Sequence, residues 1–400
     1  MPLPLSPDPR QPGARELKLY VCGVTPYDSG HMGHAFCFCA YDVLVRWVEA
    51  SGFRVRYVQN VTDVDDPLFA RARRDGVRWD ELAASQVQSF VSDMTSLGWR
   101  PPDYMPRVSG EIPIILRAVD GLVDAGVAYQ TDAVYFEARR FGDYGGLSHR
   151  TRRSMVRKLR DEGLLGEVGP GHKRDALDFP LWRASEPDEP AWPSRYGNGR
   201  PGWHIECSAM ATRYLGDQVD VHGGGRDLQF SHHESERAQS ETLTGCVPFS
   251  AAWMHTGMVR YAGHKMSKSL GNLVAVKEAL ERAPAAALRL YLASNRYRTD
   301  WSFSWERLAA AARLTAQLAD LVGGGGGGGA AAGSTGGGAG PPAAALVRGG
   351  DELVDAFAVA MDEDLDTPRA VRVLRTAIGR RQAAAAAWMA GILCGTASLT

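Results

Sequence analysis

The stretch that decides the fold of this chain is Val21-Cys22-Gly23-Val24-Thr25-Pro26-Tyr27-Asp28-Ser29-Gly30-His31-Met32-Gly33-His34. Residues 17–21 form a short apolar run that predicts a β-strand, and residues 35–50 carry apolar side chains at helical spacing. The stretch is therefore predicted to be a strand-to-helix turn. In parallel sheets such turns place ligands at the helix N-terminus, where free N–H groups and the helix dipole favour phosphate.

Two histidines, His31 and His34, end this turn, with Gly33 between them. Glycine lets a backbone approach a nucleotide closely, and imidazoles can donate hydrogen bonds to phosphate oxygens. Histidines that are satisfied inside the fold would give the same short pattern. The interpretation therefore depends on partners elsewhere in the chain.

The composition indicates a globular protein, and its 400 residues predict either one large domain with a smaller appendage or two to three domains. No apolar run is long enough to span a bilayer, and residues 1–16 are proline-rich, which predicts a disordered N-terminus without a secretory signal. The six cysteines lack the dense spacing of a disulfide scaffold, so a reducing cytoplasm and metal-binding thiols are expected. The net charge is −1, so any nucleic-acid contact must come from local patches such as residues 150–160, which a solvated helix face would also explain.

Alternating strand and helix patterns predict a doubly wound α/β fold. Residues 54–61 are expected to form a second strand, residues 69–97 and 112–125 helices, and residues 127–136 strand material. Three aspartates follow the second strand, and they would suit Mg²⁺, ribose hydroxyls or simply a helix cap: Asp63, Asp65 and Asp66. The region from about residue 100 to residue 200 is interpreted as an insertion over the ligand-binding edge, because residues 140–200 lack clean periodicity.

A second informative region brings metal-ligating residue types together. A helix is expected to begin near Ser208, a strand at residues 219–222, a tight glycine turn at residues 223–225 and a further helix at residues 234–244. His232 and Glu236 are four residues apart and so share one helical face. With Cys207 and Cys22 they would make a tetrahedral zinc site, although the pair could also interact on a surface.

A polar loop, residues 264–272, follows a predicted strand at residues 253–260 and precedes a predicted helix at residues 284–292. It carries Lys265 and Lys268, three residues apart. Such lysines could clamp a triphosphate and offset the charge on a leaving pyrophosphate, although an ordinary basic surface loop would also fit. Beyond it, residues 321–345 are rich in glycine and alanine and predict a flexible linker. Residues 346–400 predict a small helical unit broken at residues 366–368.

Together these motifs resemble the class I aminoacyl-tRNA synthetases. The sequence from His31 to His34 is similar to the HIGH signature of that class, and residues 265–269 are identical to its KMSKS signature. The closest resemblance is to the cysteine branch, which includes cysteinyl-tRNA synthetase and the related cysteine ligase of the mycothiol pathway. It is carried by residues 20–23, 202–210, 222–225 and 232–236 and covers roughly residues 17–320. The resemblance implies a Rossmann-like, HUP-type catalytic domain with an inserted connective region, followed by a truncated helical domain and no anticodon-binding domain.

The resemblance also implies residue roles. One zinc ion would be held by four residues and would bind the sulfur of the substrate, and Trp203 would lie against the amino-acid side chain. ATP, accompanied by Mg²⁺, would be held by His31 and His34, while Lys265 and Lys268 stabilise the reacting α-phosphate. The implied zinc ligands are Cys22, Cys207, His232 and Glu236; further ATP- and substrate-binding residues are Gly23, Thr25, Gly223, Gly224, Gly225, Asp227 and Ser267.

The implied reaction is ATP-dependent activation of L-cysteine to cysteinyl-adenylate, with release of pyrophosphate, by a chain that acts as a monomer. Two acceptors are expected as alternatives. Glu236, as a fourth zinc ligand, favours transfer to tRNA(Cys), and so do residues 144–148 and 174–178, which resemble the synthetase. Residues 25–28 and 65–69 resemble instead the ligase that joins cysteine to glucosaminyl-inositol, an aminosugar.

Overall fold

A computed structural model describes residues 16–27, 30–266, 271–323 and 350–395. At its centre lies a parallel sheet with the strand order β2-β1-β7-β8. Its strands are β1 (Glu16–Val24), β2 (Arg54–Val61), β7 (Val219–Gly225) and β8 (Ser250–Thr256). From β1 the chain moves to β2 on one side and later to β7 and β8 on the other. The predicted doubly wound α/β fold is therefore confirmed, with the reversal of strand order between β1 and β7.

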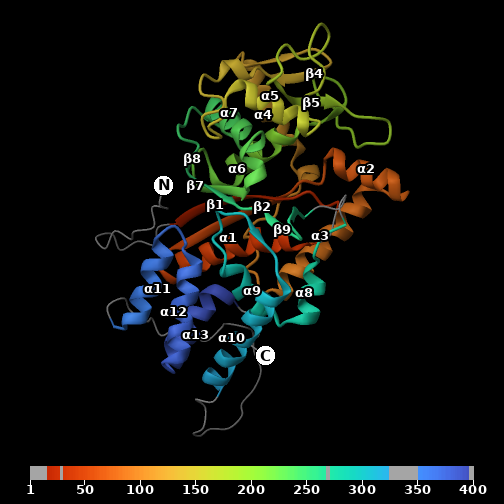
Figure 1. Cartoon of the computed structure of the whole chain (residues 1–400). Helices are drawn as coiled ribbons and strands as arrows, with labels where there is room; N and C mark the ends of the chain where they lie inside the picture. Colours follow the sequence, from red (N-terminus) through yellow and green to blue (C-terminus); the bar gives the residue numbers. More distant parts are fainter. Residues whose placement is uncertain (1–15, 28–29, 267–270, 324–349, 396–400) are drawn as a thin grey trace, which may run out of the picture.

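Helices cover both faces of this sheet, and the alternation of side chains along β1 explains how (Figure 1). Leu19 and Val21 point to the face covered by α1 (Met32–Ala50), where α9 (Ala285–Ala293) also packs. Tyr20 and Cys22 point to the opposite face, which is covered by α6 (Trp203–Leu215). Cys22 is thereby placed between the sheet and α6.

The insertion contains a second, antiparallel sheet with the order β3-β4-β5-β6. The predicted strand at residues 127–136 is in fact a hairpin of β3 (Ala128–Gln130) and β4 (Ala133–Phe136), which then pairs with β5 (Phe179–Ala184) and β6 (Gly199–Pro201). Around it lie α4 (Ile112–Asp124), α5 (Arg152–Asp161) and α7 (His232–Thr244) (Figure 1). Short 3₁₀ turns span Val108–Gly110 (η1), Ala138–Arg140 (η2) and Arg226–Gln229 (η3).

Four expected element boundaries are wrong. The helix expected over residues 69–97 is two helices, α2 (Asp66–Asp75) and α3 (Trp79–Ser96), because Gly76 adopts a φ of 67° and ends the first. Helix α6 begins at Trp203 rather than near Ser208. Residues 223–225 continue β7 rather than forming a tight turn. The strand expected over residues 253–260 is divided between β8 and β9 (Val259–Tyr261).

The C-terminal part is helical, as expected. After β10 (His264–Lys265) come α8 (Val276–Arg282), β11 (Trp301–Ser302) and α10 (Trp305–Gly323). The last helices are α11 (Glu352–Asp362), α12 (Thr367–Gly379) and α13 (Ala383–Cys394). The predicted N-terminal and linker segments lie almost entirely outside the described residues; Glu16 belongs to β1, and residues 321–323 end α10.

A buried ion pair between α9 and α1 also contacts this helical part. Arg289 on α9 and Asp42 on α1 are in contact, and both side chains are fully buried. Arg289 also donates to the carbonyl of Leu393 on α13 at 3.3 Å and to that of Leu97 at 3.4 Å. One guanidinium therefore ties three separate segments together. Among the described residues, none of the helices has the length and apolar character needed to cross a bilayer.

Candidate active site

Four side chains predicted to bind zinc meet at the carboxyl edge of the central sheet. Cys22 comes from β1, Cys207 from α6, and His232 and Glu236 from the first turns of α7. One ligand atom from each lies within 4.8 Å of the others. The Nε2 atom of His232 is 3.0 Å from Oε1 of Glu236, and the Cys22 thiol donates to the same oxygen at 3.3 Å.

The local sequence explains why these residues face one another. Cys22 lies on the α6 face of β1 by strand alternation, and Gly202 immediately precedes α6. A Cβ at Gly202 would lie 1.9 Å from the carbonyl oxygen of Pro180 in β5, so glycine is needed for α6 to start there. His232 and Glu236, one helical turn apart, then point to the same place.

The site is dry and strongly charged. Burial raises the pKa of Cys22, and the neighbouring Cys207 raises it further. Burial also opposes ionisation of Cys207, but its contacts with Cys22 and His232 lower the pKa of that thiol to about 6. Burial likewise disfavours the charged His232, yet Glu236 and Cys207 raise its pKa to about 10. Two anionic groups and one imidazolium thus lie together in a buried site, which is an environment that a divalent cation would stabilise.

The donor atoms fit zinc. Two sulfurs, one imidazole nitrogen and one carboxylate oxygen are ligands that zinc accepts in tetrahedral sites. Glu236 keeps a carboxylate at neutral pH despite its burial, because His222 and His232 hold its pKa well below the usual range. The residues present therefore suit zinc, the metal predicted from the sequence.

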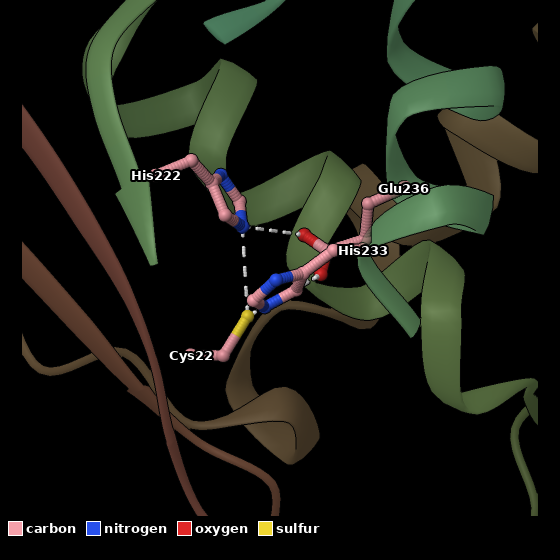
Figure 2. Close-up of side chains that lie close together, drawn as sticks. All are labelled: Cys22, His222, His233 and Glu236. Carbon is pink, nitrogen blue, oxygen red and sulfur yellow. Dashed lines mark hydrogen bonds and ion pairs between the residues drawn. The ribbon is translucent and has the colours of Figure 1, made fainter. Parts of the chain in front are cut away.

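A second group of possible ligands overlaps the first and was not predicted. Cys22 and Glu236 also lie with His222 and His233, again with ligand atoms within 4.8 Å of one another (Figure 2). The Nε2 atom of His222 is 3.1 Å from Oε2 of Glu236 and 3.6 Å from the sulfur of Cys22. The sequence shows three histidines within twelve residues: His222, His232 and His233. The strand predicted at residues 219–222 did not indicate that the side chain of His222 would face Cys22.

Trp203 lies beside the predicted zinc ligands. Its ring stacks on His232, with centroids 4.4 Å apart and an interplanar angle of 27°. His204 also contacts His232, and its Nδ1 atom is 2.9 Å from Nδ1 of His232. An amino-acid side chain bound at the four ligands would therefore meet an indole.

The two predicted phosphate-binding histidines lie at the start of α1. His31 is the N-cap of this helix, and its Nδ1 atom accepts a hydrogen bond from the backbone N–H of Gly33 at 3.0 Å. The rings of His31 and His34 stack at 4.0 Å. Burial, with a smaller effect of His31, holds the pKa of His34 well below its usual range, so His34 is neutral. The helix N-terminus that His31 caps lies at the same edge of the sheet as the metal ligands.

Glycines stand where the carboxyl ends of β1 and β7 leave no room for a side chain. A Cβ at Gly23 would lie 1.6 Å from the carbonyl oxygen of Asn60, and one at Gly223 would lie 2.2 Å from the hydroxyl of Tyr41. Gly224 and Gly225 end β7, and Asp227 follows in η3. Beyond Gly23, the hydroxyl of Thr25 donates to Asp65 at 3.3 Å.

The structure describes only part of the loop that carries Lys265 and Lys268. The backbone of Lys265 belongs to β10, whereas Ser267 and Lys268 lie outside the described residues. The chain that follows the loop reaches the start of α1, because the N–H of Met32 donates to the carbonyl of Val274 at 2.9 Å. His31 and Ala275 also form an antiparallel bridge. The end of the loop is therefore attached next to the histidine pair.

Comparison with known families agrees with this arrangement. Residues 10–313 match the family model described as "tRNA synthetases class I (C) catalytic domain". The fold and the match together define a class I tRNA synthetase domain. Within that class, the chain belongs to the family of the cysteine type that this model describes.

Curated relatives of two kinds are similar to this chain. A cysteine–tRNA ligase of Dehalococcoides mccartyi is 46% identical over 299 residues, which cover 74% of this chain and 64% of that protein. An L-cysteine:1D-myo-inositol 2-amino-2-deoxy-alpha-D-glucopyranoside ligase of Frankia alni is 49% identical over 296 residues, which cover 73% and 71%. The chain thus matches about 64% of the length of the cysteine–tRNA ligase.

Solved structures support the fold. The model aligns with methionyl-tRNA synthetase of Mycobacterium tuberculosis in complex with methionyl-adenylate, with a TM-score of 0.66 and 15% identity, over 95% of this chain and 89% of that one. A LeuRS of Agrobacterium radiobacter aligns with a TM-score of 0.68 and 11% identity, over 96% and 84%. These likenesses show a shared class I synthetase architecture.

Proposed function

We propose that this chain activates L-cysteine with ATP, forming cysteinyl-adenylate and releasing pyrophosphate. The observation that carries the proposal is the meeting of Cys22, Cys207, His232 and Glu236 at the same sheet edge as the helix N-terminus capped by His31. One group of residues can hold a sulfur-binding metal, and the other can hold a phosphate. The carboxylate of a cysteine bound between them would face the α-phosphate of ATP.

The metal site would select the amino acid. Cys22, Cys207, His232 and Glu236 would hold zinc, which supplies a Lewis acid that prefers the thiolate of cysteine to the hydroxyl of serine. Trp203 would cover the bound side chain, since it stacks on His232 at 4.4 Å. Gly23 and Thr25 would line the amino-acid backbone, because they follow Cys22 on β1 and at its end.

The nucleotide would lie along the glycine-rich end of β7 and the start of α1. Gly223, Gly224, Gly225 and Asp227 would line the adenosine, and His31 and His34 would hold the phosphates together with Mg²⁺. Neutral His34 can donate one hydrogen bond to a phosphate oxygen. Lys265, Ser267 and Lys268 would stabilise the pentacoordinate α-phosphate, so that catalysis rests on positioning and charge.

Cysteine-dependent exchange of labelled pyrophosphate into ATP tests this activation step. We expect robust exchange with cysteine and at least about 100-fold less with serine, because sulfur is the preferred zinc ligand. Exchange that is equal for both amino acids, or that is absent from folded, metal-loaded protein, would contradict the proposal.

For the second step we propose transfer of cysteine to tRNA(Cys), by one chain acting alone in the cytoplasm. The fourth ligand, Glu236, supports this acceptor, and all the site residues come from a single chain. A reducing compartment is supported because Cys22 and Cys207 must stay free thiols to bind metal. Glucosaminyl-inositol is the second candidate acceptor, supported by the 49% identity to the Frankia ligase.

One preparation can decide between the acceptors. Labelled cysteine is offered with ATP and either tRNA or glucosaminyl-inositol, and acid-precipitable aminoacyl-tRNA and the amide product are both measured. Charging of tRNA would support the first acceptor. Amide formation without charging would replace it with the aminosugar.

A further inference from the structure

Gly30, which immediately precedes His31, is held at both of its backbone polar groups. Its N–H donates to the carboxylate of Asp93, which lies on α3. Its carbonyl accepts at 3.3 Å from the N–H of Val276, in the first turn of α8. The backbone that leads into the predicted phosphate-binding histidines is therefore fixed from two separate parts of the molecule.

Asp93 is a charged residue in an almost fully buried position. It is 4% exposed, and its neighbours along α3 include the buried Phe90 and Met94. Burial raises the pKa of its carboxyl group, while Lys277 and the N–H of Gly30 act in the opposite direction. Because a buried carboxylate is costly without a hydrogen-bond partner, the contact with Gly30 stabilises Asp93 as well as the turn.

The close approach of Asp93 explains why position 30 is a glycine. A Cβ added there would lie 2.5 Å from Oδ2 of Asp93, and its three nearest atoms all belong to this side chain. The φ angle of Gly30 is outside the left-handed region, so the backbone conformation alone does not require glycine. The carboxylate of Asp93 therefore occupies the space that a side chain at position 30 would take.

The same side of α3 also reaches the second histidine of the turn. Phe90 lies three residues before Asp93, so the two side chains share one side of the helix. The ring of His34 meets that of Phe90 edge to face, with centroids 6.4 Å apart and an interplanar angle of 88°. Helix α3 thus contacts the turn at Gly30 and at His34, on either side of His31 in the sequence.

We propose that Asp93 is a positioning residue for the nucleotide. By holding the peptide before His31, its carboxylate sets the place of both histidines and of the N–H groups at the start of α1, which would meet the phosphates. A site that is already in place before ATP binds loses less free energy to ordering. This inference rests on the proposed function, because it concerns how the same site receives ATP.

Steady-state pyrophosphate exchange, with ATP and cysteine varied in turn, tests this role. In Asp93→Ala we expect kcat/KM for ATP to fall about 10- to 100-fold, because small displacements of positioned groups are costly to catalysis. The KM for cysteine should stay within about 2-fold, because the proposed metal ligands lie on β1, α6 and α7. Asp93→Asn keeps an oxygen that can accept from the N–H of Gly30, so it should recover most of the loss.

Gly30→Ala disturbs the same contact from the other side. Its methyl group should displace the carboxylate and lower kcat/KM for ATP as Asp93→Ala does. In the double variant the clashing carboxylate is gone, so the loss should be no larger than in Asp93→Ala alone. Asp80→Ala is the matched control, since Asp80 belongs to the same helix but pairs with Arg78 on the surface at 2.6 Å. This control should leave pyrophosphate exchange unchanged.

Hydrogen exchange followed by mass spectrometry gives a measure that does not depend on catalysis. In the peptide that contains residues 30–33, Asp93→Ala should speed exchange of the Gly30 amide by about 10-fold or more, and Asp93→Asn should do so much less. Unchanged amide exchange in Asp93→Ala, an unchanged kcat/KM for ATP, or additive losses in the double variant would overturn the inference. Folded, metal-loaded wild-type protein without pyrophosphate exchange would overturn the proposed function instead, and the amide measurement would still test the contact.

Discussion

At the scale of single residues, the proposed chemistry depends on a buried thiol whose pKa is lowered by its neighbours. Cys207 is almost fully buried, yet its contacts with Cys22 and His232 lower its pKa to about 6 despite that burial. A thiol with a lowered pKa suits the proposed role of Cys207 as a metal ligand. A hydroxyl in the same place would be neutral and a much poorer zinc ligand.

Cys207→Ser tests this role. We expect the variant to lose bound metal and cysteine affinity together, each by at least about 100-fold, while the fold is kept because serine is smaller than cysteine. Metal analysis and isothermal titration with cysteine give the two values, with Cys246→Ser as the control outside both ligand sets. Full zinc content in Cys207→Ser would refute its assignment as a ligand.

Asp65 gives a pH-dependent prediction at the same scale. Burial and the neighbouring Asp66 raise the pKa of Asp65 to about 6. Because this folded-state value exceeds the unfolded one of about 3.9, the folded protein holds the proton more tightly, and stability decreases as pH rises through the window between these values. Asp65 also caps α2 by accepting from the N–H of Asp66, a role that asparagine can take over.

Asp65→Asn should therefore be more stable than the wild type by about 2 kcal/mol near pH 8, after allowance for partial exposure. The gain should fall to less than half of this at about pH 4.5, where Asp65 is mostly protonated in the folded state. Urea unfolding at both pH values measures it. A gain that is independent of pH would show that Asp65 does not titrate as assigned.

At the scale of elements, the central strands approach so closely that side chains are excluded where the site begins. Gly23 on β1 faces the backbone of Asn60 on β2, where an added Cβ would lie 1.6 Å from a carbonyl oxygen. This is the point at which β1 delivers Cys22 to the pocket. The close packing of β1 against β2 at Gly23 therefore also helps to place Cys22, the proposed metal ligand.

Gly23→Ala should separate β1 from β2 and destabilise the protein by about 3 kcal/mol or more. The matched control is Gly110→Ala, since an added Cβ there would have no atom within 4 Å. The control should change the free energy of unfolding by no more than about 0.5 kcal/mol. Chemical denaturation of both variants gives the comparison, and equal stability would show that β1 and β2 tolerate a wider spacing.

At the scale of the whole molecule, one buried charge pair links the sheet domain to the C-terminal helices. Arg289 on α9 contacts Asp42 on α1 and the last turn of α13. Its burial disfavours the charge, but Asp42 raises the pKa of the guanidinium, which stays charged. The pair itself lies between α9 and α1, and the carbonyl of Leu393 connects α13 to it.

Arg289→Met should lower the free energy of unfolding by about 2–3 kcal/mol, because the buried Asp42 loses its contact with Arg289 and keeps only Arg46, 2.8 Å away, and the N–H of Arg100 as partners. Arg380→Met provides the control: Arg380 pairs with Glu352 at 3.5 Å, and both side chains are exposed. This variant should lose less than about 1 kcal/mol. Thermal unfolding of both measures the difference, and similar losses would mean that the buried pair contributes no special stability.

Much of the architecture could be predicted from the sequence because it depends on local patterns. Strand β2 has the expected bounds, and α1, α4, α7 and α9 lie within a few residues of theirs. The errors arose where tertiary contacts override local signals. Residues 223–225 looked like a glycine turn, but those glycines continue β7 because they pair with residues 254–256 of β8.

By itself, then, the sequence determined the alternation of strands and helices, the family, and the four residue types suited to zinc, because these follow from periodicity and from motifs written along the chain. Only the tertiary structure decided that Cys22 and Glu236 also face His222 and His233. The physical reason is that strand order in a sheet is a long-range property. Pairing of β1 with β7 brings residues some 200 positions apart into contact, and no local pattern records which strands will be neighbours.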